Sequence, residues 1–235
     1  VAIYERDGGV LWKHADWVTN RNESRRAREL VLTSYSNVGN YEYGFSWIFH
    51  QDGTIEMEVQ LTGIMAVRAL KGDAGQAMHH LPHGHLVAPN IEAVHHQHFF
   101  NFRLDLDIDG ADGNQVIEQN THISPSGKAN PRNNAFSMGE TLLRREMQAR
   151  RLLNLSSNRR WKVINQSETN ELGLHPGYLL FPGENSVSFS GPTSIVRKRA
   201  GFMNFHFWAT PYEPQEMNSA GRNVNQSRGG DGLIK

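Results

Sequence analysis

The sequence predicts an all-β protein, and three observations carry that prediction. Residues Thr54–Leu61 (TIEMEVQL) alternate apolar and polar side chains, which is the two-residue period of a half-buried strand. The aromatic run Tyr41–His50 (YEYGFSWIFH) has strand composition, and Gln51–Gly53 supplies turn chemistry between the two runs. Phe99–Ile108 (FFNFRLDLDI) alternates again and ends at the turn residues Asp109–Gly113. We therefore expect antiparallel strands, with residues 41–61 forming a hairpin.

Later parts of the chain show the same alternation of strand-like runs and turn-rich segments. Three runs with strand composition are separated by Gly-, Pro- and Asn-rich loops: Arg160–Asn165, Gly177–Phe181 and Phe202–Ala209. Ser124–Asn134 (SPSGKANPRNN) is a loop by composition, and the polar stretch Gln215–Lys235 is expected to be a long surface loop.

One stretch departs from the β pattern. Gly139–Leu155 (GETLLRREMQARRLLNL) reads locally as a helix. Its pairs Glu140–Arg144 and Glu146–Arg150 are spaced i, i+4, so each pair would lie on one helix face.

The composition excludes several classes of protein. The 235 residues carry 24 Lys+Arg and 24 Asp+Glu, a net charge of +0 at pH 7. This balance argues against a general polyanion binder, which needs clustered uncompensated cations. Hydrophobic residues make up 38%, too many for a fully disordered chain, and no apolar run reaches the ~18 residues of a membrane helix. Without Cys, disulfides, Cys-ligated zinc and Cys nucleophiles are impossible.

Histidines concentrate in one region, where seven of the 12 fall between His79 and His98. On a strand, His96 and His98 would face one side and His95 the other. Two imidazoles on one face can converge on a Zn, Cu, Fe or Ni ion. Because the pair supplies only two ligands, two polar residues on a solvated sheet face stay the alternative. Four further histidines are expected on an exposed loop: His79, His80, His83 and His85.

Asp105 and Asp107 repeat this geometry with carboxylates. Together with the carbonyl of Leu106 they could form half of a calcium site, because hard cations prefer oxygen ligands. A solvated strand face is the alternative.

A family resemblance rests on several segments in a fixed order. Ser36–Gly44 reads SNVGNYEYG, the strand FSWIFHQDGTIEMEVQLTGI follows, and HQH and NFRLDLDIDG come some fifty residues later. This set closely resembles the copper-containing amine oxidases. Their signature Thr-x-x-Asn-Tyr-(Asp/Glu) is matched by Asn40-Tyr41-Glu42, with Asn37 standing where the family usually has Thr. The resemblance also includes the opening ERDGGVLWKHADW and the later FWATPY and NQSRGG, so it extends over essentially the whole chain.

The resemblance implies a redox centre. It makes Tyr41 the precursor of the topaquinone cofactor, and Asn40 a residue that packs against the quinone and restrains its orientation. It makes His96 and His98 two of the three ligands of copper(II). A quinone carbonyl provides the electron sink for amine oxidation that no ordinary side chain offers.

The resemblance also implies cation sites at the periphery. Asp105, Leu106 and Asp107 match a calcium-type site found in part of the family. Glu146 matches a ligand of a second such site more loosely.

The implied activity is oxidative deamination of a small-molecule primary amine by O2, which gives aldehyde, ammonia and hydrogen peroxide. The implied fold is a large antiparallel β-sandwich that pairs into a homodimer through long hairpin arms, and the region matching Thr141–Arg151 is mainly extended. No position here matches the third copper histidine or the catalytic Asp base. We therefore expect residues 1–235 to be part of the catalytic domain, without its N-terminal domains and C-terminal strands. No nucleic-acid partner and no membrane segment are expected.

Two other interpretations remain open from the residues themselves. A cupin-like β-sandwich enzyme could hold non-haem iron with His96, His98 and a later His or Glu, but it would leave the Asn40-Tyr41-Glu42 match unexplained. A catalytically inactive β-sandwich that serves as an interaction module is the second alternative.

Overall fold

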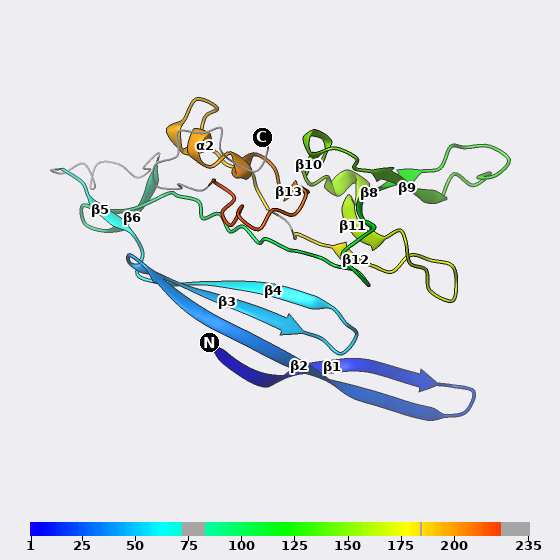
Figure 1. Cartoon of the computed structure of the whole chain (residues 1–235). Helices are drawn as coiled ribbons and strands as arrows, with labels where there is room; N and C mark the ends of the chain where they lie inside the picture. Colours follow the sequence, from blue (N-terminus) through cyan, green and yellow to red (C-terminus); the bar gives the residue numbers. More distant parts are fainter. Residues whose placement is uncertain (72–82, 184, 222–235) are drawn as a thin grey trace. The chain divides into compact units, whose positions relative to one another are not determined.

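The computed structural model describes residues 1–71, 83–183 and 185–221. This part of the chain consists mainly of antiparallel strands, which confirms the all-β prediction (Figure 1). The chain divides into two compact units, Val1–His96 and Gln97–Lys235.

The first unit contains a four-stranded sheet in the order β1-β2-β3-β4. Its strands are β1 (Ala2–Asp16), β2 (Arg21–Val38), β3 (Tyr41–Phe49) and β4 (Ile55–Gly63). Val31 and Ile48 are paired across β2 and β3, and both are fully buried. On the same ladder, Ser46 Oγ donates to Thr33 Oγ1 over 2.9 Å. Cross-strand pairs of this kind fix the register of the sheet.

The hairpin predicted for residues 41–61 is confirmed by the pairing of β3 with β4 from Tyr41↔Gly63 to Phe49↔Ile55. The turn closes because Gly53 N–H donates to the His50 carbonyl over 3.1 Å and His50 N–H donates to the Thr54 carbonyl over 2.9 Å. Gly53 adopts φ +85°, a left-handed conformation that glycine reaches without steric cost.

A three-stranded sheet completes the described part of the first unit, in the order β5-β7-β6. Its strands are β5 (Val67–Ala69), β6 (Gly84–Ala88) and β7 (Ile91–Val94). The carboxylate of Glu92 on β7 is buried and pairs with Arg68 Nε on β5 at 2.5 Å. This pair supplies the partner that a buried charge requires.

The second unit contains a four-stranded sheet in the order β12-β11-β8-β9 and a two-stranded pair β10-β13. The strands are β8 (Asn114–Ile123), β9 (Phe136–Leu142), β10 (Arg150–Arg151), β11 (Arg160–Asn165), β12 (Gly177–Leu180) and β13 (Phe207–Trp208). Its short helices are η1 (Glu146–Gln148), η2 (Leu155–Ser157), α2 (Ile195–Arg199) and η3 (Gly201–Asn204). Trp161, the second residue of β11, is fully buried, and its ring stacks on Phe207 with centroids 4.5 Å apart.

Several strand predictions are confirmed and others are wrong. The strands expected at Arg160–Asn165 and Gly177–Phe181 are β11 and β12. Residues 99–107 carry no strand, because alternation marks two faces but a strand also needs a paired neighbour. Phe202–Ala209 is mostly not a strand either, since η3 occupies its first half and only Phe207–Trp208 is paired.

The local helix prediction for Gly139–Leu155 is wrong, and the extended conformation that the resemblance implied for Thr141–Arg151 is confirmed only at its two ends. β9 runs to Leu142 and pairs with β8, and the single turn η1 precedes the short strand β10. Pairing with β8 outweighs the weak i, i+4 preference, which contributes only a few tenths of a kcal/mol per pair. Residues 124–134 form a loop with one isolated bridge, as expected.

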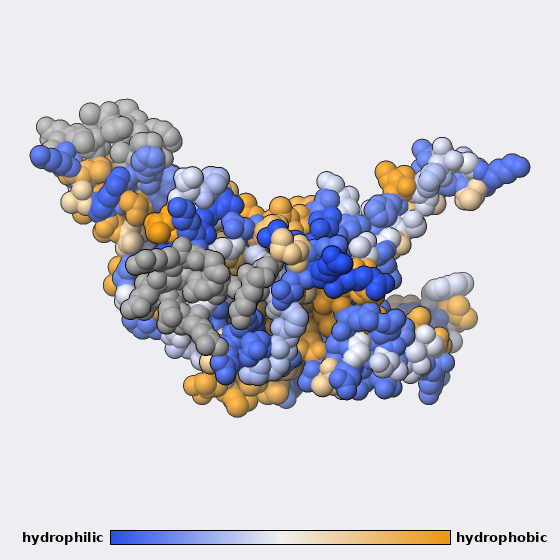
Figure 2. Space-filling view, turned by 45° about the horizontal axis from the view of Figure 1, so that its top comes forward, coloured by the Kyte–Doolittle hydropathy of each residue, from blue (hydrophilic) through white to orange (hydrophobic). Residues whose placement is uncertain are grey.

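Large apolar side chains remain exposed on both units. Figure 2 shows hydrophobic surface in separate patches among hydrophilic residues on the face that it draws. No helix among the described residues has the length and apolar character needed to cross a membrane.

Candidate functional site

Tyr41 lies at the beginning of β3, where its backbone pairs with Val38 on β2 and Gly63 on β4. Its side chain is half-buried, and its hydroxyl Oη lies 2.8 Å from Nε2 of His96, a residue 55 positions later in the chain. The two ring centroids are 5.7 Å apart. The first unit thus brings the predicted cofactor tyrosine into direct contact with one predicted metal ligand.

The hydrogen bonds around His96 define which ring nitrogen carries the proton. Nδ1 lies 2.8 Å from the Val94 carbonyl oxygen, which can only accept, so Nδ1–H donates to it. In a neutral imidazole Nε2 then has the free lone pair and accepts from the Tyr41 hydroxyl. This is the tautomer in which Nε2 can bind a metal, with the second nitrogen oriented by a backbone carbonyl.

A backbone amide also contacts the Tyr41 hydroxyl. Ala66 N–H donates to Tyr41 Oη over 3.3 Å. The phenol oxygen is therefore placed between a donor and an acceptor, which restricts the rotation of its O–H bond. Sequence reasoning missed Ala66 and Val94, because a backbone contact leaves no side-chain signal in the sequence.

Asn40 holds the segment that leads to Ala66. Its side-chain amide donates to the Ile64 carbonyl, and its own carbonyl accepts from Ile64 N–H over 2.7 Å. These two bonds connect the beginning of β3 to the residues after β4. Contact of Asn40 with a quinone stays a prediction.

His96 and His98 follow β7 in an irregular segment, so the prediction that they share one strand face is wrong. His96 is the last residue of the first unit, and His98, which is half-buried, belongs to the second. Gln97 between them is held by hydrogen bonds to Ser186, Val187 and Phe189.

The donor atoms at Tyr41 and His96 fit a borderline metal such as copper, which accepts imidazole nitrogen and oxygen ligands. Residues 1–71, 83–183 and 185–221 contain no group of three or more His, Cys, Asp and Glu side chains that could hold a metal ion. Copper binding by His96 and His98 therefore stays a prediction.

The predicted calcium residues lie in the irregular segment before β8. Asp105 and Asp107 are exposed and Leu106 is half-buried. Their assignment to a cation stays a prediction.

His83 and His85 are exposed as expected, but His85 lies on β6 and not in a loop, because β6 pairs with β7. The rings of His85 and His95 meet edge to face with centroids 4.9 Å apart, and His95 N–H donates to the His83 carbonyl over 2.8 Å. His79 and His80, which were expected on the same exposed loop as His83 and His85, lie outside the described residues.

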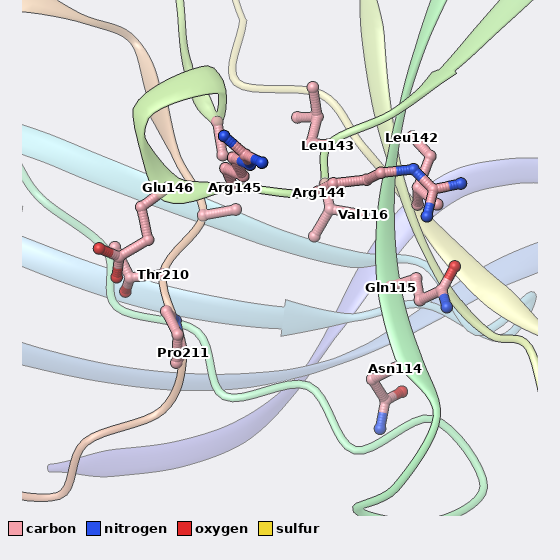
Figure 3. Close-up of a pocket in the computed structure, with 12 residues that line it drawn as sticks. Asn114, Gln115, Val116, Leu142, Leu143, Arg144, Arg145, Glu146, Thr210 and Pro211 are labelled. Carbon is pink, nitrogen blue, oxygen red and sulfur yellow. The ribbon is translucent and has the colours of Figure 1, made fainter.

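A cavity of about 590 Å³ in the second unit lies between the beginning of β8, the end of β9, η1 and residues 209–211. Figure 3 shows Arg144 and Glu146 on its wall, with side chains that point in opposite directions. Glu146 is the residue that was matched loosely to a second calcium site. Among the described residues Glu146 belongs to no group of three or more His, Cys, Asp and Glu side chains that could hold a metal ion, and its assignment to a cation stays a prediction.

Known proteins resemble this chain over almost its full length. A family model described as "Copper amine oxidase, enzyme domain" matches residues 1–235. The chain is 42% identical over 237 residues to the peroxisomal copper-containing diamine oxidase 1 of Nicotiana tabacum, covering 99% of this chain and 30% of that protein. It is 40% identical over 230 residues to a histamine oxidase of Arthrobacter globiformis, covering 98% of this chain and 33% of that protein.

A solved structure agrees with these relatives. The crystal structure of a copper-containing benzylamine oxidase from Hansenula polymorpha matches with a TM-score of 0.90 and 31% identity, covering 98% of this chain and 36% of that one. The chain therefore spans between 30% and 36% of the length of these three proteins. The matches favour neither a cupin-like iron enzyme nor an inactive interaction module.

Proposed function

Since this chain belongs to the copper amine oxidase family, we propose that it carries the redox centre of a primary-amine oxidase. In this proposal Tyr41 is the precursor of the topaquinone, and His96 and His98 are ligands of copper(II). The observation that carries the proposal is the 2.8 Å contact between Tyr41 Oη and His96 Nε2. A copper-dependent modification of a tyrosine requires the phenol next to a metal ligand, and this contact meets that requirement.

The proposed reaction converts a primary amine, O2 and water into an aldehyde, ammonia and hydrogen peroxide. The quinone formed from Tyr41 supplies the electrophilic carbonyl and the two-electron sink. The residues of this chain hold the ring that carries it. Ala66 N–H donates to the phenol oxygen and stabilises negative charge there when the proton leaves. His96 Nε2 accepts the hydrogen bond of the phenol.

Three further parts of the proposal concern the wider protein. Residues 1–235 form part of a larger catalytic β-sandwich, which is supported by their match to about a third of each relative. Asp105, the Leu106 carbonyl and Asp107 contribute to a calcium site, because exposed carboxylates and a carbonyl are the ligands that this ion prefers. The working enzyme is a homodimer, for which the exposed apolar side chains of the β1–β2 hairpin offer a contact surface.

The substitution Tyr41→Phe tests the redox assignment. It removes one hydroxyl and its hydrogen bonds, so we expect a stability change of about 1 kcal/mol and a native fold. Copper-dependent visible absorbance, reaction with hydrazines and amine turnover should all be lost. Spectroscopy of the purified protein after copper addition and a peroxide assay with primary amines measure these three properties.

Tyr43→Phe is the matched control, because Tyr43 lies on the same strand with its ring centroid 6.1 Å from that of Tyr41. We expect the control to keep absorbance and turnover. Turnover retained in Tyr41→Phe, or lost equally in both variants, would overturn the assignment.

A further inference from the structure

Gln97, the residue between the two proposed copper ligands, is attached through its side chain to a segment about ninety positions later. Its Nε2 donates to Ser186 Oγ and to the Val187 carbonyl, each over 3.2 Å. Its Oε1 accepts from Phe189 N–H over 2.8 Å. Both polar atoms of the amide are thus used, and all four residues lie within the second unit.

The segment that receives Gln97 is itself anchored at both ends. Before it, His206 Nε2 donates to the Asn185 carbonyl over 2.9 Å, while His206 Nδ1 accepts from Leu153 N–H over 3.2 Å. Behind it, Arg197 Nη1 on α2 donates to the Ser190 carbonyl over 3.2 Å. Gln97 is therefore attached to a fixed part of the second unit.

The backbone around Gln97 has no strand to support it. β7 ends at Val94, and residues 95–100 belong to no strand. In a paired strand, the backbone hydrogen bonds to a neighbouring strand would fix the direction of each side chain. Here the hydrogen bonds of the Gln97 side chain hold the backbone between the two histidines instead. Ordering a glutamine side chain costs rotamer entropy, which its hydrogen bonds must offset.

We propose that Gln97 is a positioning residue for the metal centre: by holding the backbone next to His98 onto residues 186–189, it fixes the direction in which the His98 imidazole is presented to copper. This inference rests on the proposed function of the two histidines. Residues that orient metal ligands typically change metal affinity by 10–100-fold when they are substituted.

The test is Gln97→Met in the full-length, metal-free protein. Methionine has nearly the same length and shape as glutamine but makes none of the three hydrogen bonds. We expect the Kd for copper(II) to rise 10–100-fold and the electron paramagnetic resonance spectrum of bound copper(II) to change from one species to several. In the metal-free protein, the amide of Phe189 should exchange its hydrogen faster, because its acceptor is lost.

Gln119→Met is the matched control, since Gln119 is also half-buried in the second unit and donates to Glu140 over 2.7 Å. The control should keep the wild-type copper affinity and spectrum even where its unfolding temperature falls as much as that of Gln97→Met. This separates positioning of the ligands from a general loss of stability.

Ser186→Ala tests the same connection from its other end, and it serves alone if Gln97→Met does not fold. It removes one exposed acceptor, so we expect a smaller rise in Kd than for Gln97→Met. The double variant should show no rise beyond that of Gln97→Met, because Ser186 acts through Gln97.

The outcomes distinguish the two proposals. Wild-type protein that binds no copper would overturn the proposed function and this inference with it. Tight copper binding by the wild type, with an unchanged Kd and spectrum in Gln97→Met or with equal changes in Gln119→Met, would overturn only the role of Gln97.

Discussion

The carboxylate of Glu118 on β8 is 2% exposed and lies at the centre of a charged cluster in the second unit. It accepts from Arg151 Nε at 2.6 Å and Nη2 at 2.8 Å, and Arg159 Nε lies 3.2 Å away. Burial raises the pKa of this carboxyl, but the hydrogen bonds from Arg151 and Asn120 and the two positive charges outweigh burial. The pKa of Glu118 therefore lies below its ordinary value of 4.5.

This lowered pKa makes stability depend on pH. A carboxyl whose pKa is lower in the folded than in the unfolded state contributes stability that is fully present above the unfolded value. For Glu118 that value is near 4.5, and the contribution is lost as the pH falls through the lower folded-state pKa.

We expect Glu118→Gln to lower the free energy of unfolding at pH 7 by about 2 kcal/mol, because Arg151 and Arg159 lose a buried counter-charge. The loss is limited because both arginines remain partly exposed to solvent. Urea unfolding between pH 3 and 7 checks this. The difference between wild type and variant should shrink below pH 4.5.

Glu140→Gln is the control for this prediction. Glu140 is exposed and accepts one bond from Gln119, so its substitution should cost less than about 0.5 kcal/mol. Equal losses in both variants would contradict the role given to the Glu118 cluster.

At the scale of elements, the β3–β4 hairpin places Tyr41, and Gly63 at its open end permits that placement. Gly63 pairs with Tyr41 and adopts φ +105°. A Cβ added there would lie 2.6 Å from the Asn40 carbonyl oxygen and 2.8 Å from Tyr41 Cα. Only glycine lets the two strands approach this closely while the chain turns towards Ala66.

Gly63→Ala should therefore destabilise the protein by about 3 kcal/mol, from left-handed strain together with backbone displacement. It should also slow the copper-dependent appearance of visible absorbance, because Tyr41 Cα must move. Thermal unfolding and stopped-flow absorbance measure the two effects.

The substitution Gly53→Ala tests the effect of left-handed backbone strain without displacement of a neighbouring strand. Gly53 adopts φ +85° at the other end of the same hairpin, and a Cβ there meets nothing within 4 Å. We expect backbone strain to lower the free energy of unfolding by about 1 kcal/mol. The rate at which visible absorbance appears after copper addition should not change. If visible absorbance appeared equally slowly in both variants, the position of Tyr41 would depend on the hairpin as a whole and not on the close approach at Gly63.

At the scale of the whole molecule, the β1–β2 hairpin carries apolar side chains that its own sheet does not cover. β1 is an edge strand of the sheet (Figure 1). Trp12 is 45% exposed, and Trp17 and Val18 in the turn are 90% and 72% exposed. An edge strand and contiguous exposed apolar residues are features of surfaces that another chain covers.

We expect the full-length protein to have twice the mass of one chain in light scattering at micromolar concentration. Trp17→Lys combined with Val18→Lys should shift the equilibrium towards the monomer, because charged side chains would be buried in the contact. Leu172→Lys, at a loop residue of the second unit that is 81% exposed, should leave the mass unchanged. A wild-type monomer would overturn the proposed dimer.

The sequence by itself determined the elements whose signals are local. The alternation of Thr54–Leu61 and the turn at Gln51–Gly53 specify the β3–β4 hairpin, since side-chain period and turn chemistry act between near neighbours. Arg160–Asn165 was predictable as β11 for the same reason. The motif around Tyr41 and the H-Q-H pattern also identified the family from residue order alone.

Only the tertiary structure decided what depends on distant partners. Gly139–Leu155 has the charge spacing of a helix, but its first residues pair with β8 as part of β9. Phe99–Ile108 has the alternation of a strand, but the structure has no strand there. The Tyr41–His96 hydrogen bond, the Ala66 amide and the attachment of Gln97 to residues 186–189 each join residues 25 or more positions apart. Such contacts form only where the packed chain brings those atoms together, and periodicity within a short window of sequence contains no information about that distance.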